Sequence, residues 1–169
     1  MGCGWSGRSG AVGPWAVAVL AVIGGVAACG GDVDDGAETV GVGSVVRAEL
    51  ADAEAANAPG QHLYLQEVTI GPDTRLSTHY HDGIQIATIR SGTLTYHMLE
   101  GSVEITRADG TTETVAAPAV TELEPGDAVV EPVDAVHFGE NAGDEPVVIT
   151  LAALVAADAE IATVVDDPD

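Results

Sequence analysis

The sequence has no lysine and only two cysteines, and each shortage excludes a kind of partner or of stabilisation. The chain has five arginines and 27 acidic residues, which gives a formal net charge of −22 at pH 7. A charge of this size and sign repels nucleic acid and anionic lipid head groups, so neither is expected as a partner. The cysteines are Cys3 and Cys29. With a single cysteine left after removal of a leader segment, the mature chain cannot hold an internal disulfide.

Aromatic side chains are also scarce. The chain has two tryptophans, three tyrosines and one phenylalanine, and both tryptophans, Trp5 and Trp15, lie in its first 29 residues. The remainder therefore lacks the broad stacking surfaces on which sugars and other flat ligands bind. This composition argues against a dedicated carbohydrate-binding module.

The first 29 residues are typical of an export signal. Arg8 precedes an apolar run that ends in Val26-Ala27-Ala28-Cys29. This order of charge, apolar segment and small residues predicts a signal peptide over residues 1–28. The ending also resembles a bacterial lipobox, which implies lipidation at Cys29 and a protein held outside the cytoplasm. The alternative is an ordinary signal peptide in which the cysteine occurs by chance, so that the product is freely secreted. Contact with the membrane is expected through the lipid anchor only.

The remaining chain is expected to form one domain between two polar segments. Residues 29–44 are rich in glycine and acids and predict a flexible tether. Residues 45–157 are assigned to the domain, with weak helical spacing over Val45–Asn57 and short β-type runs from His62 onward. A hairpin is expected around Arg107–Thr111, which contains Asp109-Gly110. Residues 158–169 are acidic and predict a frayed tail.

Two sequence blocks carry the chemistry. The first, within 71–92, places His79 and His81 two residues apart and Gln85 four further on. The second, Gly126–Asn141, contains Pro132 and His137. Residues two apart on a strand point to the same face, so His79 and His81 present both imidazoles to one side, and Gln85 keeps this parity if the strand continues. Imidazole nitrogens and an amide oxygen are suitable ligands for a transition metal.

These blocks resemble the two motifs of the cupin superfamily, with Gln85 in place of a glutamate and Asp134 in place of a glycine. The resemblance implies an all-β fold, a single cupin jelly-roll β-barrel, similar to the small quercetin-dioxygenase-like cupins. It also implies one metal ion held by His79, His81, Gln85 and His137. The cofactor is expected to be a divalent transition metal, with Fe, Mn, Ni and Zn left open. Asn141 ends the second motif, where its side chain can tie a turn to backbone groups.

Gln85 changes the expected chemistry of the site. Three imidazoles and an amide leave a divalent ion with its full formal charge, which favours Lewis-acid chemistry over redox chemistry through a trivalent state. An amide also cannot act as the general base that a glutamate could provide. The change Gln85→Glu is therefore expected to tighten metal binding. No substitute for the missing base can be identified in the sequence.

Three functions remain open at this stage. The first is an enzyme that acts on a small oxygenated organic molecule by dioxygenase-, isomerase- or lyase-type chemistry. The second is a non-catalytic module that binds a metal or a small molecule at the cell surface. The third is a structural cupin with a vestigial metal site. The partner is a small molecule in the first two cases, and a second copy of the chain, forming a homodimer, is also left open.

Overall fold

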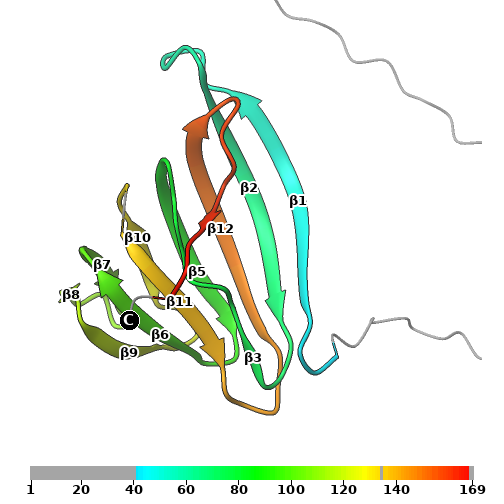
Figure 1. Cartoon of the computed structure of the whole chain (residues 1–169), viewed down its shortest axis with the longest axis vertical. Coiled ribbons are helices and arrows are strands. Elements are labelled where there is room, and N and C mark those ends of the chain that lie inside the picture. The colour runs from blue at the N-terminus through cyan, green and yellow to red at the C-terminus, as the bar shows by residue number, and fades with distance from the viewer. Residues whose placement is uncertain (1–40, 134, 168–169) are drawn as a thin grey trace, which may run out of the picture. The chain divides into compact units, whose positions relative to one another are not determined.

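The computed structural model describes residues 41–133 and 135–167, and every regular element in these ranges is a β-strand (Figure 1). The predicted signal, Cys29, the tether up to residue 40 and Asp134 lie outside the described residues. The strands are β1 (Val45–Glu54), β2 (Gln61–Ile70), β3 (Thr74–Arg75), β4 (His79–Tyr80), β5 (Ile84–Ser91), β6 (Leu94–Glu100), β7 (Ser102–Thr106), β8 (Thr112–Ala116), β9 (Ala119–Leu123), β10 (Ala128–Glu131), β11 (Val136–Asn141), β12 (Val147–Ala156) and β13 (Thr163–Val164).

The strands form two antiparallel sheets. The larger sheet has the order β1-β2-β12-β5-β10-β7-β8, and the smaller has β13-β4-β11-β6-β9, with β3 also paired to β11. Chain-consecutive strands β4, β5 and β6 alternate between the sheets, while β12 returns to lie between β2 and β5 (Figure 1). This exchange between two facing sheets is the jelly-roll arrangement. The predicted all-β jelly-roll fold is confirmed.

Alternating side chains explain why these segments form strands around a common core. Every second residue of β12 is buried, beginning with Val147, and β5 alternates exposed and buried residues from Ile84 to Ile89. A period of two places one face of each strand toward the interior. The inner faces of both sheets supply the buried apolar core, which includes Val68, Ile70, Ile89, Leu94, Met98, Val103, Ile105, Leu123, Val129, Val147, Leu151 and Val155.

The weak helical spacing over Val45–Asn57 gave a wrong expectation. Val45–Glu54 forms strand β1, which pairs along its length with β2 and has a register shift between Glu49 and Ala51. Intrinsic propensity is a weak term, and pairing with a ten-residue neighbour satisfies the backbone of β1 despite its alanines and glutamates. As the edge strand it remains mostly exposed, which accounts for its polar composition.

The predicted hairpin between the two motifs is present. β7 and β8 pair antiparallel with Thr106 opposite Thr112. The Arg107 amide donates to the Thr111 carbonyl at 2.8 Å, and Gly110 takes a φ of 85°. Such a φ is strained for residues with a Cβ, so the Asp109-Gly110 turn signal has a direct conformational cause.

The C-terminal segment is not frayed, contrary to the expectation for residues 158–169. Within its described part, β13 pairs with β4, placing Thr163 opposite Tyr80. The Val165 amide donates to the Thr78 carbonyl at 2.9 Å, and Asp167 accepts a 2.8 Å bond from Arg75. We call residues 157–167 the C-terminal strap, because they include β13, the edge strand that pairs with β4 in the smaller sheet. Composition alone missed these long-range backbone bonds.

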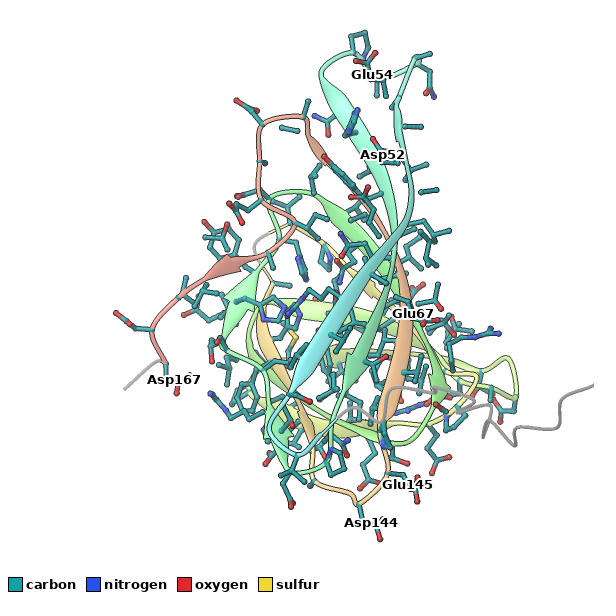
Figure 2. The ribbon with its side chains drawn as sticks, turned by 90° about the vertical axis from the view of Figure 1, so that its right-hand side faces the viewer. Asp52, Glu54, Glu67, Asp144, Glu145 and Asp167 are labelled. Carbon is teal, nitrogen blue, oxygen red and sulfur yellow. The ribbon has the colours of Figure 1, made fainter. Side chains whose placement is uncertain are left out.

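Acidic side chains are spread over the outside of the domain. Figure 2 labels Asp52, Glu54, Glu67, Asp144, Glu145 and Asp167, which lie on β1, on β2, in the loop before β12 and after β13. Five of them are exposed and Glu67 is half-buried. No helix long and apolar enough to cross a membrane occurs in residues 41–133 and 135–167.

Candidate metal centre

Three histidines converge between the sheets. β4 and β11 pair so that His79 lies directly opposite His137, and His81 follows the end of β4. One ring nitrogen from each histidine lies within 4.8 Å of those of the other two. His81 and His137 are each 2% exposed, and His79 is half-buried. The three-histidine cluster could therefore hold a metal ion.

Backbone carbonyls fix the tautomer of each ring. The Nδ1 atoms of His79, His81 and His137 lie 2.8, 2.6 and 2.8 Å from the carbonyl oxygens of Ser77, Ile161 and Ala135, respectively. A carbonyl oxygen can only accept, so each Nδ1 carries the hydrogen. In the neutral ring this leaves a lone pair on Nε2. A hydrogen bond from the second ring nitrogen to a carbonyl is the arrangement that orients metal-binding histidines.

Gln85 reaches the same interior by a different path from the one predicted. Strand β4 ends at Tyr80, and the chain turns at 81–83 and enters β5 of the other sheet, so the assumed continuous strand is wrong. Gly83 makes this turn possible, because a Cβ there would lie 2.0 Å from the Leu154 carbonyl oxygen. Gln85 is 6% exposed. Its Oε1 is buried and has no hydrogen-bond partner among the described residues, which leaves it free to act as the predicted ligand.

A carboxylate that the sequence analysis missed lies in the centre of the cluster. Glu131, 3% exposed on β10, faces Gln85 in the register of β5 and β10. Its Oε1 lies 3.2 Å from His137 Nε2, and its Oε2 lies 3.3 Å from His81 Nε2. Its position was readable in part, because Glu131 shares the parity of Val129, which is 2% exposed. The signal was obscured by Pro132 immediately after it.

Two neutral groups hold this carboxylate in place. Gln85 Nε2 donates to Oε2 of Glu131 at 2.7 Å, and the Tyr96 hydroxyl donates to Oε1 at 2.9 Å. Tyr96 lies on β6 of the smaller sheet and stacks on His137, with ring centroids 5.1 Å apart. The site thus joins β5 and β10 of one sheet to β4, β6 and β11 of the other.

The electrostatics of the metal-free site are those of an ion pair. Burial opposes ionisation of Glu131, but His137 and His81 more than offset it and hold the pKa of Glu131 well below its usual range. Burial likewise opposes the charge on His137, but the facing carboxylate raises the pKa of His137 above its ordinary value. Burial, reinforced by His137, lowers the pKa of His79 to about 4. Burial and Glu131 raise the pKa of Tyr96, which stays protonated. Without metal, the imidazole of His137 next to Glu131 balances the charge of the carboxylate.

A cavity of about 440 Å³ opens over the cluster. Its walls are largely apolar and come from both sheets and from the C-terminal strap, for example Leu76, Leu151 and Ile161. Arg47 of β1 and Glu160 of the strap are charged residues in its lining outside the cluster. Apolar walls with a few convergent polar groups are typical of small-molecule sites.

The two motif ends show how the backbone supports the site. Counting back from His79, the first glycine of the motif falls on Asp73, a further departure from the pattern. Asp73 nevertheless has a φ of 49°, the left-handed conformation that glycine adopts freely and aspartate tolerates. At the other end, Asn141 Nδ2 donates to the carbonyls of Ile70, Gly71 and Glu145 at 2.9–3.0 Å. The predicted tie between Asn141 and backbone groups is confirmed.

Known proteins resemble the chain in backbone course. No family model matches it, and no curated protein does. Among solved structures it is similar to a cupin-like protein from Thermotoga maritima, at 18% identity and a TM-score of 0.49, over 73% of this chain and 77% of that one. A cupin domain from Bordetella pertussis is 16% identical with a TM-score of 0.42, over 68% of this chain and 97% of that one.

Larger proteins are similar over part of their length. A cupin 2 conserved barrel protein from Leptotrichia buccalis is 20% identical with a TM-score of 0.44, over 66% of this chain and 41% of that one. A DMSP lyase structure is 16% identical with a TM-score of 0.46, over 62% of this chain. The chain spans less than half of either protein's length, 44% for the lyase. At these identities and TM-scores, the similarity does not indicate what this chain binds or catalyses.

Proposed function

We propose that this chain is a cupin-type metalloprotein that holds a divalent transition metal at His79, His81 and His137. The observation that carries the proposal is the orientation of the three rings. Each Nδ1 is committed to a backbone carbonyl, and the three neutral rings leave lone pairs at neighbouring Nε2 atoms in a buried space. Buried nitrogen acceptors that lack donors are costly unless a proton or a metal compensates them. Gln85 Oε1, buried without a hydrogen-bond partner among the described residues, supports the same assignment.

The bound ligand is proposed to be a small oxygenated organic molecule. The cavity over the cluster is lined mainly by apolar side chains, which suits a carbon skeleton, and the cluster supplies its polar end. Arg47 lines the same cavity, and no ion pair involving it occurs in residues 41–133 and 135–167, so its guanidinium is available to a carboxylate. When bound, a divalent ion would polarise a carbonyl, hydroxyl or carboxylate oxygen of such a ligand. Such polarisation would suit dioxygenase-, isomerase- or lyase-type chemistry, the classes that the resemblance to quercetin-dioxygenase-like cupins suggests.

A non-catalytic binding module is the second candidate, and one observation favours it. The polar side chains next to the histidines already form hydrogen bonds with one another. Glu131 accepts one from Gln85 and one from Tyr96. A base must reach the proton it removes, and a carboxylate already held by two donors is restrained from doing so. Turnover of enolic or carboxylate substrates by the metal-loaded protein would show that the protein is an enzyme rather than a binding module.

Removal of one of the three imidazole rings should greatly weaken specific metal binding. We expect purified protein to bind about one equivalent of Co²⁺, and His137→Ala to lower the affinity by about 100-fold or more, since even loss of an outer partner costs roughly 10–100-fold. Titration followed by the visible Co²⁺ spectrum measures both. His62→Ala is the matched control, because His62 lies at the far end of β2 beside Asp52. The titrations need matched, high ionic strength, since an acidic surface collects cations without specificity.

Equal Co²⁺ binding by the parent protein and His137→Ala would contradict the proposal. The ions would then be on the acidic surface, and the cluster would be a vestigial site in a structural cupin. A parent protein that binds Co²⁺ with a spectrum altered by a small carboxylate would support ligand binding at the metal.

We further propose that the protein is exported and anchored by a lipid at Cys29. The support is the Val26-Ala27-Ala28-Cys29 ending of the apolar run together with the absence of any other cysteine beyond residue 3. Expression with labelled palmitate should label the parent protein and not Cys29→Ser, and the parent should partition into detergent. A free thiol detected in the mature parent protein could only be that of Cys29, and it would refute lipidation.

A further inference from the structure

Asp127 and Glu131 are both buried acidic side chains, but the groups that contact them differ in charge. Asp127, 4% exposed, accepts bonds from Arg107 and from the amides of Ala108 and Glu124 at 2.7–3.1 Å. Glu131 is equally buried, yet no arginine contacts it in the described part of the chain. A buried carboxylate requires a positive partner, and Asp127 has a permanent one. Glu131 faces imidazole nitrogens instead.

Strand register places Glu131 where a ligand carboxylate is needed. In the paired strands β5 and β10, Glu131 lies directly opposite Gln85, the position at which the motif has glutamate. Both side chains point into the interior, and their ends meet in a 2.7 Å hydrogen bond. One carboxylate and one amide are therefore present at this pair of positions, with the carboxylate on β10 and the amide on β5.

The contacts of Glu131 leave each oxygen turned toward one imidazole. Oε2 accepts from Gln85 and lies 3.3 Å from His81 Nε2, and Oε1 accepts from Tyr96 and lies 3.2 Å from His137 Nε2. The two donors fix the carboxylate but contribute no positive charge. When the rings are neutral, the space between Glu131 and the three histidines is therefore lined only by hydrogen-bond acceptors. Such a set of nitrogen and oxygen lone pairs is suited to bind a cation.

We propose that Glu131 is the anionic ligand of the metal centre, and that Gln85 and Tyr96 position it. This inference rests on the proposed metal site and adds a carboxylate to it. A divalent ion bound by neutral rings and Glu131 carries one unit less of net charge than the sequence-based ligand set implied. The expectation that the trivalent state is disfavoured, which depended on Gln85 as the only fourth ligand, no longer holds, since the anionic ligand stabilises the higher charge.

The first test replaces the charge and keeps the shape. Glu131→Gln should lower Co²⁺ affinity by about 10- to 100-fold or more, as expected for loss of a partner at the metal, and should shift the visible spectrum of the bound Co²⁺. Glu104→Gln on β7 is the matched control, because Glu104 is exposed on the face of β7 opposite to the buried Val103 and Ile105. Circular dichroism and thermal unfolding show whether each variant is folded.

The second variant guards against a folding defect. Gln85→Glu combined with Glu131→Gln exchanges the two side chains across the strand pair and preserves the amide–carboxylate hydrogen bond. It should recover Co²⁺ affinity to within about tenfold of the parent, because the carboxylate is again beside the histidines.

Two further results would overturn the inference and leave the metal site intact. If the parent binds Co²⁺ through His137 but Glu131→Gln binds it as tightly or more tightly, with an unchanged spectrum, then Glu131 only pairs with a protonated ring. If the exchanged variant folds but fails to recover affinity, the carboxylate is not a ligand at this pair of positions. Absence of stoichiometric Co²⁺ binding by the parent would instead overturn the proposed function itself.

Discussion

Replacing Asn141 with alanine is expected to lower the free energy of unfolding by about 3–5 kcal/mol. Asn141 is 1% exposed, and its amide nitrogen donates to three carbonyls from the end of β2, the following turn and the loop before β12. Its Oδ1 also accepts from the Gly143 amide at 3.0 Å. Alanine would leave these backbone groups without partners in a space too enclosed for easy hydration. Urea unfolding at pH 7 measures the loss.

Two comparisons make this prediction specific. Asn141→Asp should be at least as damaging as alanine, because a carboxylate would face three carbonyl oxygens that need donors. Asn57→Ala, in an exposed turn, should change the unfolding free energy by no more than about 0.5 kcal/mol. A loss of less than about 1 kcal/mol in Asn141→Ala would mean that solvent replaces these bonds readily.

The second large effect is expected for Gln85→Glu. The new carboxylate would replace the amide nitrogen that lies 2.7 Å from Glu131 Oε2, so two buried acids would face each other. Like charges at this distance cannot both ionise without a large cost, and the amide donor that Gln85 offers to Glu131 is lost. In metal-free protein we expect the free energy of unfolding to fall by about 3–5 kcal/mol.

Divalent metal should reverse this loss, because a cation between the two carboxylates relieves their repulsion. The sequence-based expectation of tighter metal binding by Gln85→Glu is therefore retained, with an added cost to the metal-free protein. Urea unfolding with a chelator, and again with excess Co²⁺, measures both quantities. Gln66→Glu is the control, since Gln66 lines the same cavity from β2 without a hydrogen bond to a carboxylate in the described structure. Equal metal-free stability of Gln85→Glu and the parent would show that residues 85 and 131 do not meet.

Much of the architecture was predictable because it depends on local patterns. Period-two alternation and Gly, Pro and Asp turns predicted most of the strands from β2 to β12, and Asp109-Gly110 predicted the β7–β8 hairpin. The spacing of His79 and His81 predicted that their imidazoles share one face, and the resemblance to the cupin motifs predicted that His137 meets them. These features require only that each strand place one face inward.

The features that were missed depend on pairing between distant segments. Glu131 acquires its meaning from the register of β10 against β5, and β1 forms because β2 offers it a partner edge. The C-terminal strap is held by bonds from Ile161, Thr163 and Val165 to residues about 80 positions earlier, which its acidic composition conceals. A window of neighbouring residues does not show with which distant segment a strand will pair.

The bond from His81 Nδ1 to the Ile161 carbonyl has a consequence for biosynthesis. His79 and His81 leave the ribosome first and His137 follows later, but the carbonyl that orients His81 is made 80 residues after that histidine. A nascent chain that has not yet reached Ile161 therefore lacks part of the cluster's support. If the proposed metal is bound, the complete cluster is available to it only after the strap has emerged, so the supply of ions at the place where the chain completes its folding would influence which metal binds.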